Sequence, residues 1–455
     1  MQKAIIKYGA LALGALAVSQ PALAAPVAEA VETAAEAAAP AADAVGGGTA
    51  YIFNTLLFLI GGFLVMWMAA GFAMLEAGLV RTKNTSTQCL KNIGLYSIAG
   101  LMFWVIGYSI AYPGFGEGSL GLFGVAGFPY SMQEVGSADL DTGYSVASDW
   151  FFQMVFCATT ASIVSGTVAE RVKIVPFFIF VTILTAIIYP VVVSWEWGGG
   201  YLDTVHGFSD FAGSTLVHST GGWAALVGAL IIGPRLGRYG ANGQVNVFPG
   251  SNIPLATLGT FILWLGWFGF NGASQLAMGT VGDASDVSKI FVNTNMAAAG
   301  GVVVAIILTQ LRYKKADVTM ALNGALAGLV SITAEPLAPT VGQSILIGGI
   351  GGAIVVFTVP LLDKLKIDDV VGAIPVHLIA GIWGTLIVAW TGDATFMGQL
   401  VGVVLTAVWV SLASAVIWFA LKATIGVRPS EEVEMAGLDI HETGVEAYPG
   451  LANQA

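Results

Sequence analysis

Charge is scarce in this sequence. Of its 455 residues only 10% are charged, whereas 56% are hydrophobic. A soluble protein of this size needs about a quarter of its residues charged to cover its surface. Repeated apolar runs of about 20 residues account for the deficit, because each is long enough to cross a ~30 Å hydrocarbon layer as a helix. A soluble enzyme is therefore excluded, and the 59 glycines suit the close packing of membrane helices.

Cysteine is nearly absent as well. The two cysteines, Cys89 and Cys157, fall in or beside apolar runs, where packing is a sufficient reason for both. Two cysteines build neither a disulfide framework nor a cysteine metal cluster. The sequence also lacks a nucleophile–base constellation, so we predict no metal, no cofactor, no nucleic-acid partner and no enzyme activity.

The N-terminus differs from the rest of the chain. Lys3 and Lys7 precede a short apolar stretch, and Ala22-Leu23-Ala24 follows it as a small-residue cleavage site. This pattern is typical of a secretory signal peptide, because the apolar stretch is too short to span a membrane. We predict a signal peptide over residues 1–24 and an Ala-rich leader outside the membrane over 25–50. The alternative is an uncleaved membrane anchor.

Eleven apolar runs predict an all-α polytopic membrane protein with its eleven-span domain over 51–424 and a C-terminal tail over 425–455. The predicted spans are 51–79, 93–112, 148–168, 175–195, 210–233, 254–276, 291–311, 318–334, 343–361, 371–391 and 398–423.

The positive charges predict the orientation of these spans. Apart from Lys3 and Lys7, every Lys and Arg except Lys289 falls on the same side of the predicted bundle. Cytoplasmic loops retain basic residues, so the N-terminus is expected outside and the tail inside. The outer loops are expected to be acidic, with Asp149 and Glu196 among them. A negative outer face would attract cations, although ordinary solvated loops explain these charges equally well.

Two histidines lie inside the apolar runs. Eleven spans divide into two sets of five plus one, and an odd set makes the second half run upside down relative to the first. Such inverted repeats place a substrate site near the midplane. His218 and His377 lie in the fifth span of each half, separated along the membrane normal by an expected distance of about 10 Å. Neutral imidazoles can pass hydrogen bonds to a small polar solute and relay protons. The alternative is two packed histidines bonded to helix carbonyls.

Aromatic residues collect on the outer side of His218. Phe152 and Phe156 lie four residues apart in the third span, as do Phe270 and Ser274 in the sixth, and Trp197 opens the loop before the fifth. Aromatic faces attract cations by about 0.5–2 kcal/mol, and a hydroxyl can replace one water of hydration. We expect this group to hold a small cation, although interface aromatics are a competing explanation for each residue.

The same segments resemble the Amt/Mep/Rh ammonium transporter family, in its bacterial Amt form. The matching stretches are 76–84, 151–156 with 169–171, 210–218 with 228–233, 266–271 and 431–439. One departure is Leu378, which follows the second histidine where the family has glycine.

The resemblance implies an eleven-helix homotrimer in the bacterial inner membrane, surrounded by lipid and regulated in the cytoplasm by PII-type proteins. It implies a role for each of the following residues: His218 and His377 as the twin pore histidines; Phe156 and Phe270 as a stacked gate; Trp197, Ser274 and Phe156 as the ammonium recruitment site; Phe152 and Gln153 as flanking gate positions; and Asp210 as a supporting aspartate. Asp210 also begins the fifth span and is expected to cap it.

We therefore expect an ammonium transporter, with methylammonium as a second substrate. Ammonium is recruited outside and deprotonated, and ammonia, with or without the proton, moves past His218 and His377. An ammonium sensor is one rival, but residues 424–455 are too few for an output domain. A neutral gas channel is another, against which Trp197 argues because a gas needs no cation site. A membrane enzyme has no supporting motif.

Overall fold

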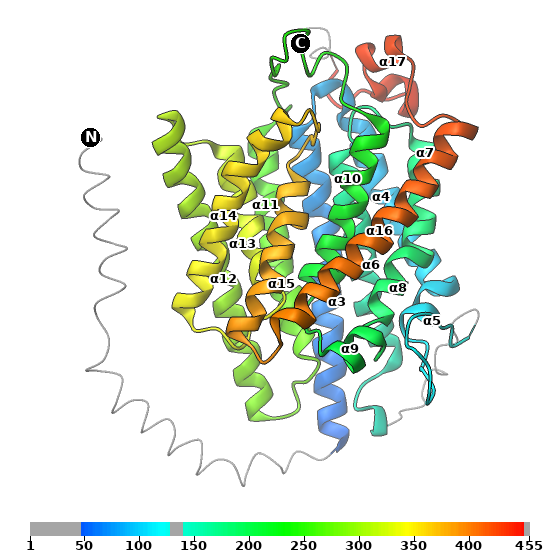
Figure 1. The fold of residues 1–455 in the computed structure, drawn as a ribbon, viewed down its shortest axis with the longest axis vertical. Helices are drawn as coiled ribbons and strands as arrows, with labels where there is room; N and C mark the ends of the chain where they lie inside the picture. The colour runs from blue at the N-terminus through cyan, green and yellow to red at the C-terminus, as the bar shows by residue number, and fades with distance from the viewer. Residues whose placement is uncertain (1–46, 128–139, 450–455) are drawn as a thin grey trace.

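The computed structural model describes residues 47–127 and 140–449. The predicted signal peptide, 1–24, and most of the predicted leader lie outside these residues. Helices running between the two ends of one bundle make up the described chain (Figure 1). We call the end that carries α17 (Glu431–Ala436) the tail face, and the opposite end, which carries the short α9 (Tyr201–His206), the α9 face.

All eleven predicted spans are helical. In the first half they are α3 (Gly47–Leu79), α4 (Thr85–Met102) continued by α5 (Tyr108–Ala111), α6 (Val146–Thr167), α7 (Ile174–Ile183) continued by α8 (Tyr189–Ser194), and α10 (Thr220–Ile232). In the second half they are α11 (Ile253–Gly272), α12 (Val281–Tyr313), α13 (Val318–Ile332), α14 (Val341–Lys364) and α15 (Ala380–Thr391), followed by α16 (Phe396–Thr424).

Within 47–127 and 140–449, nine helices are both long and apolar enough to cross a membrane. The remaining two spans are α6 and the 15-residue α13. Both lie inside the bundle, and every residue of α6 from Phe152 to Thr167 is buried. A helix surrounded by other helices needs less apolar surface than one that faces lipid.

Four of the spanning helices in the described part of the chain contain a wider π-type turn, in which the hydrogen bond runs over five residues; a fifth such turn, η8 (Asp439–Thr443), lies in the tail. The four turns in the spans are Phe103–Gly107 (η2), Leu184–Ile188 (η4), Ser214–Ser219 (η5) and Ile374–Ile379 (η7). Proline explains two of them, because it donates no backbone hydrogen bond: Pro190 follows η4 and Pro375 lies in η7. Such turns often mark functional positions in helices.

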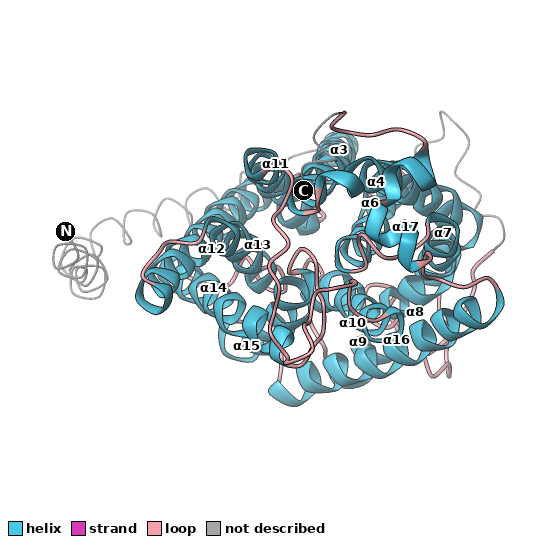
Figure 2. Cartoon of the chain, turned by 90° about the horizontal axis from the view of Figure 1, so that it is seen from above, coloured by secondary structure: helices cyan, strands magenta, loops and turns pink. Residues whose placement is uncertain are grey.

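The two halves meet where α3 packs against α11. The helices are antiparallel, as the predicted inverted repeat requires, and glycines bring their backbones together. A Cβ added to Gly61 would lie 3.4 Å from the oxygen of Gly269, and one added to Gly71 would lie 3.0 Å from that of Gly259. Viewed along the bundle, this pair lies on the side opposite to α16 (Figure 2). The tilted α16 packs against α10 and α15, one helix from each half (Figure 1).

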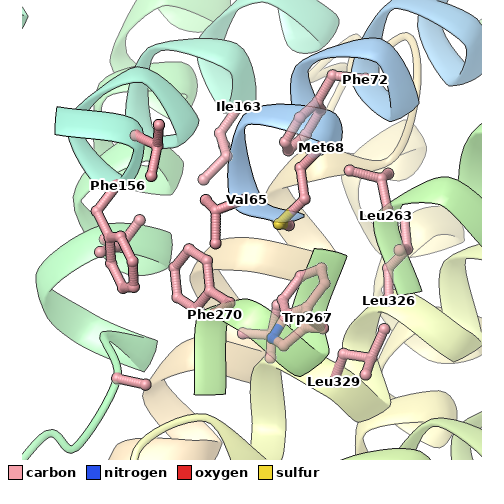
Figure 3. Close-up of a cluster of buried hydrophobic side chains, with 14 of the residues drawn as sticks. Val65, Met68, Phe72, Phe156, Ile163, Leu263, Trp267, Phe270, Leu326 and Leu329 are labelled. Atoms are coloured by element: carbon pink, nitrogen blue, oxygen red, sulfur yellow. The ribbon is translucent and has the colours of Figure 1, made fainter. Parts of the chain in front are cut away.

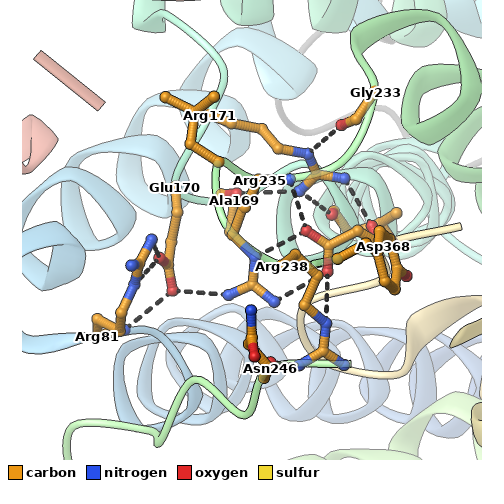
Figure 4. Close-up of polar contacts among 12 residues, drawn as sticks. Arg81, Ala169, Glu170, Arg171, Gly233, Arg235, Arg238, Asn246 and Asp368 are labelled. Carbon is orange, nitrogen blue, oxygen red and sulfur yellow. Dashed lines mark hydrogen bonds and ion pairs between the residues drawn. The ribbon is translucent and has the colours of Figure 1, made fainter. Parts of the chain in front are cut away.

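A buried ionic cluster joins the loops of the tail face (Figure 4). Glu170 accepts hydrogen bonds from the backbone of Arg81 and from Arg235 Nη1, both at 3.0 Å. Arg235 Nε also donates to Asp368 at 2.8 Å. Burial alone would raise the pKa of Glu170, but Arg235 and Arg81 outweigh burial and lower the pKa below its usual value. These contacts hold Glu170 at a φ of 67°, a left-handed conformation that is unfavourable for a residue with a Cβ.

The C-terminal segment is docked on this face. Asp439 accepts hydrogen bonds from the Thr87 amide (2.8 Å) and hydroxyl (2.9 Å), and so supplies the cap at the start of α4. Glu434 accepts from the Leu236 amide at 2.8 Å and forms an ion pair with Arg428. The tail therefore contacts both the start of α4 and the loop after α10, which lie near the two ends of the first repeat.

Two charged residues that the sequence analysis assigned to loops are buried in helices. Lys91 was expected in a loop but is buried inside α4, and Asp149 was expected in an outer loop but is buried in the first turn of α6. Both have polar partners inside the protein: Lys91 donates to Ser165 O, and Asp149 accepts from Tyr108. Buried charges are tolerated when they are paired in this way. The orientation of the bundle in a membrane stays a prediction.

Candidate functional site

The two predicted pore histidines meet in the middle of the bundle. The Nδ1 atoms of His218 and His377 are 3.2 Å apart, and the ring centroids are 5.2 Å apart with the planes inclined by 24°. A hydrogen bond between two Nδ1 atoms requires one ring to donate and the other to accept. The two rings are therefore closer together than the separation of about 10 Å along the membrane normal that was expected from helices starting at the membrane surface.

Both helices instead start inside the protein, and each start is built in the same way. Asp210 is fully buried, and its carboxylate accepts the amides of residues 213–216 at 2.7–3.0 Å. Asp369 accepts the amide of Ile374 at 2.7 Å. Each aspartate precedes its histidine by eight residues, and a left-handed glycine stands three residues after it, at 213 with φ 103° and at 372 with φ 82°. This Asp-x-x-Gly-x₄-His pattern occurs in both halves, and it is a sequence signal from which Asp369 could have been found.

Glycines also let the two π-type turns touch. A Cβ added to Gly222 would lie 2.6 Å from Leu378 Cβ, and one added to Gly381 would lie 2.5 Å from Ser214 O. Each glycine follows the histidine of its own half by four residues and receives the turn of the other half. The close crossing therefore depends on both glycines.

Aromatic rings continue the line from His218 toward the α9 face. Phe156 and Phe270 stack with centroids 4.0 Å apart, and Phe270 lies 5.2 Å from the ring of His218. Trp267 also stacks on the His218 ring at 5.0 Å, lies 5.9 Å from Phe270, and donates its Nε1 proton to Thr333. Figure 3 shows Phe156, Phe270 and Trp267 packed in sequence within the core. Phe156 and Phe270 form an apolar constriction, and Phe270 is the ring that contacts the histidine pair.

A cavity of about 420 Å³ opens on the other side of this constriction. Five predicted site residues line it: Phe152, Gln153, Phe156, Trp197 and Ser274. The Trp197 ring stands edge-on to Phe156 at 5.9 Å, and its Nε1 donates to Asp210 O at 2.9 Å. The Ser274 hydroxyl donates to Phe270 O at 2.8 Å, which leaves its lone pairs free to accept.

Sequence comparison decides the family. The model of the Ammonium Transporter Family matches residues 56–448. The chain belongs to the ammonium transporter family. Among curated relatives, this transporter is 40% identical over 425 residues to ammonium transporter Amt2 of Archaeoglobus fulgidus, covering 86% of this chain and 87% of the relative. It is 38% identical over 426 residues to Amt1 of Haloferax mediterranei, covering 88% and 80% respectively.

Solved structures agree with the fold. A sensor Amt protein superposes with a TM-score of 0.79 at 35% identity, covering 86% of this transporter and 98% of that chain. Mep2 of Candida albicans gives a TM-score of 0.74 at 25% identity, covering 87% and 90%. Membership of the family makes the chain a transporter and not an enzyme, as the sequence predicted.

A second, narrow cavity lies on the tail-face side of the histidines. Its volume is about 10 Å³, which is room for about one water molecule. His377 lines it together with Phe72, Glu76, Ser162 and Asn323, among others. The ring of Phe72 is 6.1 Å from that of His377. The histidine pair of this transporter therefore separates a wide cavity from a narrow one.

Two predicted site residues lie behind the wide cavity rather than in its wall. Phe270 is covered by Phe156, and Asp210 is turned inward to cap η5, so the expected capping geometry of Asp210 is confirmed. Three tyrosines and Asp149 also line the cavity and were missed as site residues; the tyrosines are Tyr108, Tyr112 and Tyr144. Their spacing along the chain gives no periodic signal, because they come from two helices and a loop.

The described residues also show whether any group of side chains could hold a metal ion. Across residues 47–127 and 140–449, no group of three or more His, Cys, Asp or Glu side chains is placed to hold a metal ion.

Proposed function

We propose that this transporter takes up ammonium from the wide cavity, removes one proton from it, and passes ammonia along His218 and His377 toward the tail face. The observation that carries the proposal is the 3.2 Å contact between the two Nδ1 atoms, in line with the stacked rings and with a cavity on each side. Methylammonium is proposed as a second substrate.

Desolvation explains why a proton must leave. Moving an unpaired ion into an apolar passage costs far more than moving a neutral amine. The ring faces of Trp197 and Phe156 and the Ser274 hydroxyl offset part of this cost in the wide cavity. Phe156 and Phe270 then exclude water and hydrated ions from the histidines. Phe152, Gln153 and Asp210 support this arrangement by packing and hydrogen bonding.

We further propose that the α9 face is external and the tail face cytoplasmic, in a bacterial inner membrane. The arginine-rich loops of the tail face support this orientation. A PII-type regulator is proposed to bind there, where residues 425–449 are docked. Large exposed side chains on α3 and α11, such as Phe63, Trp67 and Phe261, suit contact with lipid or with further copies in a homotrimer.

Ammonia entry into liposomes tests the proposed function. Purified protein is reconstituted, ammonium is added outside, and total internal ammonium is measured over time. We expect saturable entry above that of protein-free liposomes, impaired in His218→Ala. His441→Ala is the matched control, because His441 is exposed in the tail. Entry no faster than in protein-free liposomes would reject the proposal.

A further inference from the structure

A buried pair of opposite charges lies between the histidines and the tail face. Glu76 on α3 is 1% exposed and Lys91 on α4 is fully buried. Gln88 and Ser165 join them. Glu76 Oε2 accepts from Gln88 Nε2 at 2.6 Å and from the Ser165 hydroxyl at 2.7 Å, while Lys91 Nζ donates to Gln88 Oε1 at 3.1 Å and to Ser165 O at 2.8 Å.

The second carboxylate oxygen of Glu76 has no such partner. Oε1 is buried and accepts no hydrogen bond from any residue in the described ranges. An unsatisfied buried acceptor costs about 1–3 kcal/mol, so its presence calls for a reason. Glu76 lines the same narrow cavity as His377, and this cavity has room for about one bridging water.

Glu76 lies on the tail-face side of His377, as its position on α3 shows. Phe72, whose ring is 6.1 Å from that of His377, lies one helical turn before Glu76 on the same face of α3. Since α3 runs toward the tail face and ends at Leu79, the carboxylate lies about 6 Å further toward that face than Phe72. Glu76 is thus the ionisable group that lines the narrow cavity together with His377.

We propose that Glu76 accepts the proton that ammonium loses, after the proton has been relayed along His218 and His377; this inference rests on the proposed function. Once ammonium has left the wide cavity and passed the Phe156–Phe270 stack without its water, one of its N–H bonds breaks and a bond to His218 Nε2 forms; this atom is buried and unpartnered in the described structure. The Nδ1 proton of His218 moves across the 3.2 Å contact to His377 Nδ1. His377 releases its Nε2 proton through one water to Glu76, which becomes a neutral carboxylic acid.

Atoms and charges balance over this sequence. One ammonium becomes one ammonia, the histidines exchange tautomers, and Glu76 holds one proton until water at the tail face takes it. The rings return to their starting tautomers by flipping or by exchange with water. Transport is then accompanied by one positive charge per ammonia.

If Glu76 only balanced the charge of Lys91, removing both charges together should leave charge transfer unchanged. Glu76 and Lys91 are buried opposite charges linked through Gln88 and Ser165, and replacing both charges of such a buried pair with neutral residues of similar volume is often harmless to stability. In the double variant Glu76→Gln/Lys91→Met, the Gln oxygen still accepts from Gln88 and Ser165, and Met fills the space of the lysine stem. Packing is preserved, but the proton acceptor is gone.

The test measures charge and ammonia in the same proteoliposomes. Ammonium-driven current is integrated on a solid-supported membrane, and internal ammonium is assayed in parallel. We expect the double variant to retain ammonia entry while charge transfer falls by about 10²-fold, a typical contribution of a positioned proton acceptor. Asp363→Asn/Arg238→Met, which neutralises an ion pair on the tail face, is the control and should keep the wild-type ratio of charge to ammonia.

A charge-conserving variant guards against misfolding of the double variant. Glu76→Asp still faces Lys91 but withdraws the carboxylate from the cavity by about 1.5 Å, so charge transfer should fall while ammonia entry persists. Wild-type current in Glu76→Asp or in the folded double variant would overturn the inference. Ammonia entry without charge in the wild type would also overturn it and leave the proposed function standing. No ammonia entry in the wild type would instead reject the proposed function itself.

Discussion

Replacing Trp197 with Leu removes one aromatic face from the wide cavity and tests whether that face binds the cation. Trp197 stands edge-on to Phe156 at 5.9 Å and is only half-buried, so a cation beside it is partly desolvated. A cation–π contact contributes about 0.5 kcal/mol at an exposed site and about 2 kcal/mol when desolvated. Since each 1.4 kcal/mol is a tenfold change, the half-saturating ammonium concentration should rise by about 2- to 30-fold.

The assay is the concentration dependence of ammonium-driven current in liposomes. Trp197→Phe separates the two functions of the side chain, because it keeps an aromatic face but loses the 2.9 Å hydrogen bond to Asp210 O. It should shift the half-saturating concentration less than Trp197→Leu does. Trp390→Leu, at a residue that is 67% exposed, is the matched control and should leave the curve unchanged. An unchanged half-saturating concentration in Trp197→Leu would refute the reasoning.

Three further substitutions test the parts that position the site. Gly381→Ala places a Cβ 2.5 Å from a backbone oxygen and should cost about 1–3 kcal/mol, seen as a lower thermal unfolding temperature together with slower ammonia entry; wild-type stability would show that the helices do not cross so closely. Asp369→Ala leaves the amide of Ile374 without its acceptor and should slow ammonia entry by misplacing His377, and entry at the wild-type rate would contradict this. Glu170→Gln breaks a buried ion pair and should destabilise the protein by about 3–5 kcal/mol at neutral pH. Because the pKa of Glu170 is lowered in the folded protein, its contribution to stability is present above about pH 4.5 and is lost as the pH falls below that value. The unfolding temperature of the variant should therefore fall less steeply with decreasing pH than that of the wild type. An equally steep fall in both proteins would count against the ionic cluster.

The fold was largely predictable because membrane helices have a strong compositional signal. Eleven apolar runs correspond to eleven helical spans, including α6, which carries Asp149 and Gln153 and was still predicted as the apolar run 148–168. Less predictable was the depth at which helices begin. The start of η5 at Ser214 is buried because Asp210 caps it inside the protein, and hydropathy does not distinguish this from a start at the surface.

The site was predictable where it depends on residue type and spacing, and less so where it depends on pairing. His218 and His377 were found because each is the lone histidine in a matching span. Glu76 and Lys91 were not recognised as a pair, since a lysine near the end of a span has the same sequence signature as a lysine in a loop. Asp369 escaped notice because only the repeated Asp-x-x-Gly-x₄-His spacing identifies it, and that repeat is short.

Ammonium-driven current in liposomes, compared between the wild type and the His218→Ala and His377→Ala variants, tests the central claim most directly. The two imidazoles touch at 3.2 Å, so removing either breaks the line between the two cavities. The account predicts a saturable current in the wild type that is lost or altered in selectivity in both variants. Wild-type current with wild-type selectivity in both variants would contradict it and move the pathway away from the histidine pair.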